Sequence, residues 1–241
     1  MLLGGCRNPQ QAGQDVGANR ATGPGNPAIG AATLVAHLGH SDAISCARLS
    51  RDGHYVITAS RDHTARLWET STGREIREFI GHQDRVTSAV ISADGRFVLT
   101  ASRDCTARLW ETATGREVRR FVGHSGPLYS AALSTDSLVV LTASEDGTAR
   151  LWQTATGRAL QTFTGHRGPV LSATFSRDDR FALTSGSDGT ARLWDCSSGR
   201  DIHEFLGHHG TVFTASFAND GRSVLTAGDD RTVRLWDIAG E

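Results

Sequence analysis

Histidine, threonine and aspartate recur in this 241-residue chain as a set with constant internal spacing. In the first copy, His40 is followed by Thr58, Asp62 and then Trp68. The same residue types return every 42 residues, so that the chain holds five such sets. A base, a hydroxyl and a carboxylate are the parts of a nucleophilic triad, in which the base removes the proton of the attacking hydroxyl. Each set must therefore be weighed as a candidate active site.

Several features of the sequence argue against catalysis. Five equivalent active sites in one chain are implausible, and nothing resembles a Gly-x-Ser-x-Gly elbow or an oxyanion loop. The other five histidines form no metal-ligand cluster: His37, His54, His63, His203 and His209. The cysteines show no paired spacing typical of a disulfide framework or a zinc site: Cys6, Cys46, Cys105 and Cys196. We therefore expect no catalytic residue, no metal site and no cofactor.

The spacing of the sets belongs to a wider repeat of 42 residues. Gly-His opens each copy, at Gly39, Gly81, Gly123, Gly165 and Gly207. Leu-Trp closes each copy and uses all five tryptophans of the chain: Trp68, Trp110, Trp152, Trp194 and Trp236. A period of about 40 to 45 residues with these ends indicates a propeller blade, and a blade cannot bury its faces without its neighbours. The repeats therefore predict one domain over residues 31–241.

The second copy shows the strand pattern of one repeat. We expect strands at Val86–Ile91, Arg96–Ala101, Ala107–Glu111 and Arg116–Val122, because these runs are rich in β-forming residues. Asp94-Gly95 suits a tight hairpin turn, since glycine readily adopts the positive φ that such a turn requires. The fourth strand carries the most charge. Four antiparallel strands of increasing polarity fit a blade whose first strand lines a central channel.

This pattern resembles the WD-repeat β-propeller family over roughly residues 31–241. The closing dipeptide is Trp-Asp only at Trp194 and Trp236, but its second residue is variable in that family. The resemblance implies an all-β propeller of five four-stranded blades and a bacterial type with near-identical repeats. It also implies that the recurring polar set is an internal brace: His40, Thr58, Asp62, Trp68; His82, Thr100, Asp104, Trp110; His124, Thr142, Asp146, Trp152; His166, Thr184, Asp188, Trp194; His208, Thr226, Asp230, Trp236.

The last copy ends at Glu241, after its third strand. Alignment on Gly-His places Ala32–Leu38 where the other copies have a fourth strand, so that an N-terminal strand is expected to complete the last blade and to remove an exposed edge. Members of the family usually have seven blades. We favour a closed five-bladed monomer, and the alternatives are an open arc or a larger ring built from two chains.

The resemblance places partner binding on the top face, which is formed by the loops before strand one and the turns between strands two and three. The positions there that differ between copies should form an arginine-bearing side and an apolar side with acidic points: Arg61, Arg85, Arg103; Tyr129, Leu171, Phe213, Glu145, Asp229. Aromatic residues beside arginine are typical of interaction hot spots. The alternative is that Tyr129, Leu171 and Phe213 plug a narrow channel.

The formal net charge of −1 argues against a nucleic-acid groove, and no apolar run approaches the roughly 20 residues that span a bilayer.

Residues 1–30 are rich in Gly, Gln, Asn, Ala and Pro and are predicted to be a disordered tail. Within them Leu3-Gly4-Gly5-Cys6 resembles a lipobox, although too few residues precede Cys6 for a signal peptide. The chain as it stands is thus expected to be cytoplasmic, and a start further upstream would instead make it a membrane-anchored lipoprotein.

These observations predict a non-enzymatic scaffold that binds a peptide or protein segment on its top face. The alternative is an envelope lipoprotein, tethered through Cys6, that assists an extracytoplasmic complex. An in-frame basic and then apolar segment upstream of Met1 would favour the lipoprotein. A hydrolase or lyase that uses the central channel would need a cluster of acids, histidines or metal ligands there, and the sequence offers none.

Overall fold

The computed structural model describes residues 39–238. The predicted tail, Cys6 and the predicted closing strand Ala32–Leu38 lie outside the described residues. The described residues form β-strands joined by turns, and none of them forms a helix that is long and apolar enough to cross a membrane.

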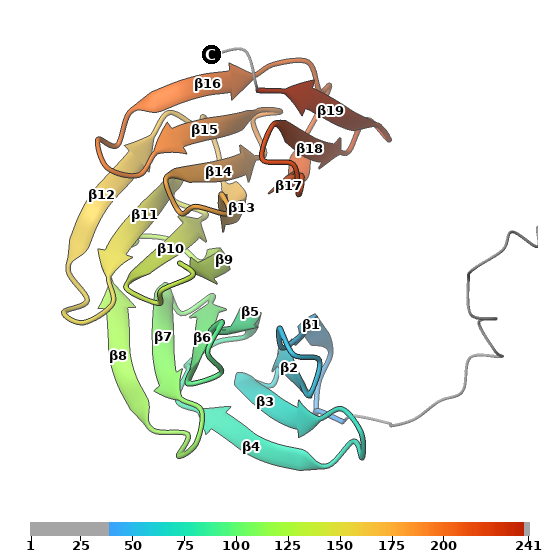
Figure 1. The fold of residues 1–241 in the computed structure, drawn as a ribbon, viewed down its shortest axis with the longest axis vertical. Helices are drawn as coiled ribbons and strands as arrows, with labels where there is room; N and C mark the ends of the chain where they lie inside the picture. The colour runs from blue at the N-terminus through green and yellow to red at the C-terminus, as the bar shows by residue number, and fades with distance from the viewer. Residues whose placement is uncertain (1–38, 239–241) are drawn as a thin grey trace, which may run out of the picture. The chain divides into compact units, whose positions relative to one another are not determined.

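The strands group into five antiparallel sheets in chain order (Figure 1). The first sheet holds β1 (Ile44–Leu49), β2 (Tyr55–Ser60), β3 (Thr64–Glu69) and β4 (Glu75–Ile80). The second holds β5 (Val86–Ile91), β6 (Phe97–Ser102), β7 (Thr106–Glu111) and β8 (Glu117–Val122). The third holds β9 (Leu128–Leu133), β10 (Val139–Ser144), β11 (Thr148–Gln153) and β12 (Ala159–Thr164). The fourth holds β13 (Val170–Phe175), β14 (Phe181–Gly186), β15 (Ala191–Asp195) and β16 (Asp201–Phe205). The fifth holds β17 (Val212–Phe217), β18 (Ser223–Gly228) and β19 (Val233–Asp237).

The second sheet shows how local chemistry sets the strand ends. The first strand has the predicted bounds, whereas β6, β7 and β8 each differ by one residue from the prediction. Arg96 was predicted to open a strand, but its amide donates to the Asp94 carboxylate and it therefore belongs to the turn. Arg116 likewise donates to the Thr114 hydroxyl. Gly95 takes a φ of 72°, as the Asp-Gly turn requires.

Each hydrophobic core is shared between two successive sheets. Ile57, Leu67 and Phe79 of the first sheet pack with Val86 and Trp110 of the second. The Phe79 and Trp110 rings lie 5.9 Å apart between centroids, and the same pairing recurs at each later boundary: Phe121 with Trp152, Phe163 with Trp194, and Phe205 with Trp236. A blade's tryptophan thus packs against the preceding blade, and no repeat holds a complete core by itself.

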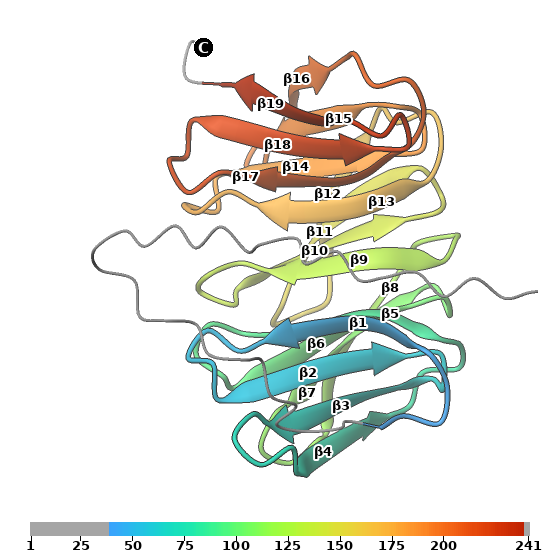
Figure 2. The same cartoon turned by 90° about the vertical axis from the view of Figure 1, so that its right-hand side faces the viewer.

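The two end sheets each leave one apolar face uncovered by described residues. Leu67 of the first sheet is 1% exposed, whereas Leu235, at the same repeat position in the fifth sheet, is 69% exposed. Ile44 and Leu49 of β1 are also exposed. Figure 2 looks onto the inner strands, among them β1, β9, β13 and β17, with the first and fifth sheets at opposite ends of the row. Closure into a five-bladed ring is not formed by the described residues and stays a prediction.

Candidate binding surface

The recurring polar set forms one hydrogen-bonded network in each sheet. In the second sheet, Thr100 lies in the middle of β6 and Trp110 in β7, and the indole Nε1 donates to Thr100 Oγ1 at 2.9 Å. His82 precedes β5, and its two ring nitrogens lie 2.7 Å from Thr100 Oγ1 and 2.7 Å from an Asp104 oxygen. The other sheets repeat the arrangement, with His–Thr distances of 2.6 to 2.8 Å. The strands and loops of one blade are therefore tied together by four side chains.

The donors and acceptors of this network define its chemistry. An ionised Asp104 only accepts, so the His82 nitrogen facing it carries the proton, and the other nitrogen accepts from the Thr100 hydroxyl. Thr100 in turn accepts from the indole, which can only donate. The side chain of Thr100 is fully buried. A substrate cannot reach this buried hydroxyl, which fits the expected bracing role better than activation of a nucleophile.

The surroundings of the brace shift the pKa values of its aspartate and histidine side chains. Burial raises the pKa of Asp104, but hydrogen bonds from His82 and Thr106 more than offset it and hold the pKa of the carboxyl below its usual range. In the third sheet the same balance lowers the pKa of Asp146 to about 2. Burial lowers the pKa of His82 and of His124. In the second and third sheets, the brace is thus a neutral imidazole facing a carboxylate near neutral pH.

The brace also positions the loops of the top face. Gln83, just after the brace histidine, donates its amide to Asp104 at 3.1 Å. The turn between β6 and β7 is then joined to the loop before β5, because the Arg103 amide donates to the Arg85 carbonyl at 3.0 Å. Every sheet has the equivalent backbone bond, from Arg61, Glu145, Ser187 and Asp229 to residues 43, 127, 169 and 211. Residues of these two loops therefore lie side by side in each blade.

Three of the predicted binding residues are in contact at the boundary of the second and third sheets, and the charge of a fourth, Arg85, acts on one of them. The Tyr129 hydroxyl on β9 donates to Glu145 Oε2 at 2.7 Å, and Arg103 Nη2 of the preceding sheet lies 3.8 Å from the same oxygen. Burial and the bond to Glu145 raise the pKa of the Tyr129 phenol, while Arg103 and Arg85 act in the opposite direction. We call Arg85, Arg103, Tyr129 and Glu145 the Tyr129 cluster.

The other four predicted residues lie elsewhere on the sheets. Leu171 on β13 is half-buried, and Phe213 on β17 is 55% exposed. Arg61 and Asp229 are exposed in their turns. Where the expected arginine-bearing side meets the expected apolar side with acidic points, Arg103 and Glu145 form an ion pair. Sequence position within a repeat gave no information about distances between repeats.

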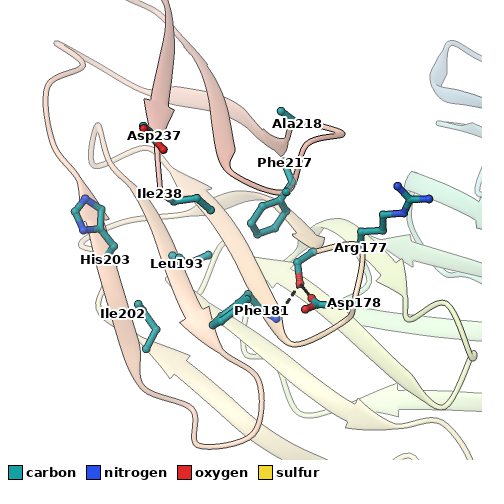
Figure 3. A pocket seen from close by; sticks show the side chains of 12 residues that line it. Arg177, Asp178, Phe181, Leu193, Ile202, His203, Phe217, Ala218, Asp237 and Ile238 are labelled. Carbon is teal, nitrogen blue, oxygen red and sulfur yellow. Dashed lines mark hydrogen bonds between the residues drawn. The ribbon is translucent and has the colours of Figure 1, made fainter. Parts of the chain in front are cut away.

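A large cavity lies elsewhere, between the fourth and fifth sheets (Figure 3). This groove of about 810 Å³ is walled by apolar side chains with charged residues at the rim: Phe181, Leu193, Ile202, Phe217, Ile238; Arg177, Asp178, Asp237. Equivalent positions of the third and fourth sheets line a groove of about 420 Å³. Because such grooves recur at the sheet boundaries, this one is a feature of blade packing, able to take an apolar side chain.

One recurring residue was missed at the sequence level. An arginine recurs on each third strand, and in three of the sheets it pairs with carboxylates of the fourth strand, as in Arg66 with Glu75 at 3.0 Å and with Glu78 at 2.7 Å. Its signal was available, since the arginine has the same 42-residue period and, in the first and fourth copies, acids follow 9 and 12 residues later.

Five antiparallel sheets, four of four strands and one of three among the described residues, share cores and carry one polar network each, and this arrangement defines a β-propeller. The comparisons agree: the family described as the IFT122 first β-propeller matches residues 30–241, and the chain belongs to that family. The chain is also similar to MST50-interacting protein 11 of Pyricularia oryzae, with 48% identity over 42 residues. That match covers 17% of this chain and 13% of the relative, so that it corresponds to a single repeat.

Proposed function

We propose that this propeller is a non-enzymatic scaffold that binds a peptide or protein segment on its top face, with the Tyr129 cluster at the centre of the site. Membership in a propeller family supports a role in protein interaction, and the relative matched over one repeat is named as an interacting protein. The proposal depends chiefly on the contact of Tyr129 and Arg103 with one Glu145 oxygen, which joins non-repeated residues of two blades.

The chemistry of the cluster suits a recognition site. Tyrosine and arginine dominate interaction hot spots, because they combine a large contact area with directed hydrogen bonds. Glu145 holds the phenol in one orientation, so that little side-chain entropy remains to be lost on binding. The Arg103 and Glu145 side chains are 31% and 41% exposed, and both can turn part of their hydrogen-bonding capacity toward a partner.

The test compares variants of the cluster with a matched variant at the other end of the strands. Partners captured by cross-linking would be identified, purified and titrated against Tyr129→Ala, Arg103→Ala and the control Arg96→Ala, whose exposed side chain lies in the turn between β5 and β6. We expect the first two to weaken binding by at least tenfold with an unchanged melting temperature. Equal affinity of all three variants would refute the site.

The channel-plug alternative predicts a different result. A plug would make Tyr129→Ala and Phe213→Ala lower the melting temperature and leave partner binding of the folded protein intact. Phe213 is 55% exposed, so we expect Phe213→Ala to leave the melting temperature within about 2 °C of the parent, as surface substitutions usually do.

A further inference from the structure

The third-strand arginines are neutralised in the same way in three sheets. Arg66 meets Glu75 and Glu78, Arg108 meets Glu117 at 2.9 Å, and Arg192 meets Asp201 and Glu204. In each case the carboxylates come from the neighbouring fourth strand. In the fifth sheet, Arg234 lies 3.6 Å from Asp230.

Arg150 in the third sheet differs from all of these. The positions that carry carboxylates in the first and fourth sheets are here Ala159 and Thr162, and Thr162 pairs directly with Arg150 across the ladder of β11 and β12. Among residues 39–238, no carboxylate lies within ion-pairing distance of the Arg150 guanidinium. The brace Asp146, whose counterparts Asp104 and Asp230 lie near their own arginines, does not reach it.

The guanidinium of Arg150 is nevertheless held in place. Its Cζ lies 5.9 Å from the centroid of the Trp152 ring, which favours a cation at that point. The side chain is half-buried, and its Nε is buried without a hydrogen-bond partner, as in the other third-strand arginines. The terminal nitrogens are therefore the groups left to bind an anion. Thr162 beside them is exposed, so the position is reachable from solvent.

We propose that Arg150 is a binding site for the carboxylate of an acidic side chain supplied by a partner peptide or protein. The small Ala159 leaves the space that Glu75 and Asp201 occupy in their sheets, and the Thr162 hydroxyl can add a hydrogen bond. A carboxylate is the favoured anion because carboxylates fill the equivalent positions inside this chain, where each terminal nitrogen of the arginine donates to a different carboxylate. The site shares no residue with the Tyr129 cluster and stands independently of it.

The first experiment measures binding of a fluorescent Glu-Gly-Glu-Gly-Glu peptide at low salt, with Gln-Gly-Gln-Gly-Gln for comparison. We expect binding of the acidic peptide alone. Arg150→Gln should weaken binding of the acidic peptide by about tenfold or more, because it removes the guanidinium. Ala159→Glu should weaken this binding by about tenfold or more, because its carboxylate pairs with Arg150 from within the chain. Arg200→Gln changes the net charge equally at an exposed residue of the next sheet and should leave affinity within about twofold.

A second measurement needs no ligand. If Ala159→Glu places its carboxylate on Arg150, it should raise the melting temperature above that of Ala159→Gln, and this gain should vanish when Arg150→Gln is also present. The proposal fails if Arg200→Gln weakens binding as much as Arg150→Gln, or if Ala159→Glu binds like the parent. It also fails if the two peptides bind equally, or if inorganic phosphate binds Arg150 and the acidic peptide does not.

Discussion

The Arg77 guanidinium donates a 2.7 Å hydrogen bond to the carbonyl oxygen of Ala113, which lies 36 residues further on, in the turn between β7 and β8 of the next sheet. Arg119 makes the same contact with Ala155 at 2.5 Å, and Gln161 makes it with Ser197 at 3.0 Å. We call this hydrogen bond, donated by Arg77, Arg119 or Gln161, the clasp. It joins the outer strand of one blade to the outer turn of the next. The outer edges of the sheets are thus held by a side chain and a backbone acceptor, whereas the inner parts are held by apolar packing.

Removing one clasp should loosen the propeller modestly. Arg119→Met keeps most of the aliphatic stem and loses the bond to Ala155, so the free energy of unfolding should fall by about 0.5–1.5 kcal/mol. Urea denaturation measures the change. Arg116→Met, at an exposed arginine in the turn before β8, is the control and should change stability by less than about 0.5 kcal/mol. Equal effects of the two variants would mean that the clasp contributes no stability.

Substitutions in the brace should destabilise the protein more than removal of a clasp does. Thr100→Val keeps the shape of the side chain but leaves the buried Trp110 indole and the His82 ring without their partner, at a cost of about 1–3 kcal/mol for each group orphaned. Thr100→Ser keeps the hydroxyl and should cost less. Differential scanning calorimetry of the two variants checks the order. A Thr100→Val variant as stable as Thr100→Ser would show that the hydroxyl is not needed.

Acid should destabilise the protein in two steps. The pKa of His82 and of His124 is lower in the folded chain than the ordinary 6.5, so the unfolded chain binds these protons first and stability falls as the pH drops below about 6.5. The brace aspartates also have lowered pKa values, about 2 for Asp146, so the stability that they contribute above about pH 3.8 is lost progressively as the pH falls below that value.

Melting temperatures recorded from pH 8 to pH 2 test both steps. We expect a plateau above about pH 7, a decline below it and a steeper decline below about pH 4. A melting temperature that rises between pH 7 and pH 5 would show that protonated histidine is the stabilising form, contrary to the burial of His82.

One leucine position tests how cores are shared. Leu67→Ala removes a side chain that is 1% exposed within the core of the first and second sheets, and it should cost about 2–5 kcal/mol. Leu235→Ala changes the equivalent residue of the fifth sheet, which is 69% exposed, and should cost less than about 1 kcal/mol. Chemical denaturation of both variants gives the comparison. A large loss in Leu235→Ala would mean that other residues cover this face.

The sequence was sufficient to predict the features that repeat identically. The period located Thr100, Asp104 and Trp110 within their strands and turns, and hydrogen bonds join these residues in the structure. Strand bounds differed by one residue where a side chain captured a backbone amide, as Asp94 does with Arg96. Such competition depends on local geometry, which alternating patterns do not encode.

Contacts between residues of different repeats could not be predicted from the sequence. The Arg103–Glu145 ion pair depends on the angle between two blades, and no spacing in one dimension specifies that angle. The clasp could not be predicted from the sequence for another reason. Arginine and glutamine both serve as its donor, and the acceptor is a backbone carbonyl, so residue identity carries little signal. Arg150 became visible only when the partners of its counterparts were known.

Each of these cores takes its phenylalanine from one sheet and its tryptophan from the next, and this division has a consequence for how copy number changes. A tandem duplication of any 42-residue stretch, whatever phase it starts in, adds one Phe–Trp contact, one clasp and one complete core. Recombination between copies therefore needs no particular breakpoint to yield a foldable product. Blade number can drift by whole units, while Tyr129, Glu145 and Ala159 keep the third copy distinct.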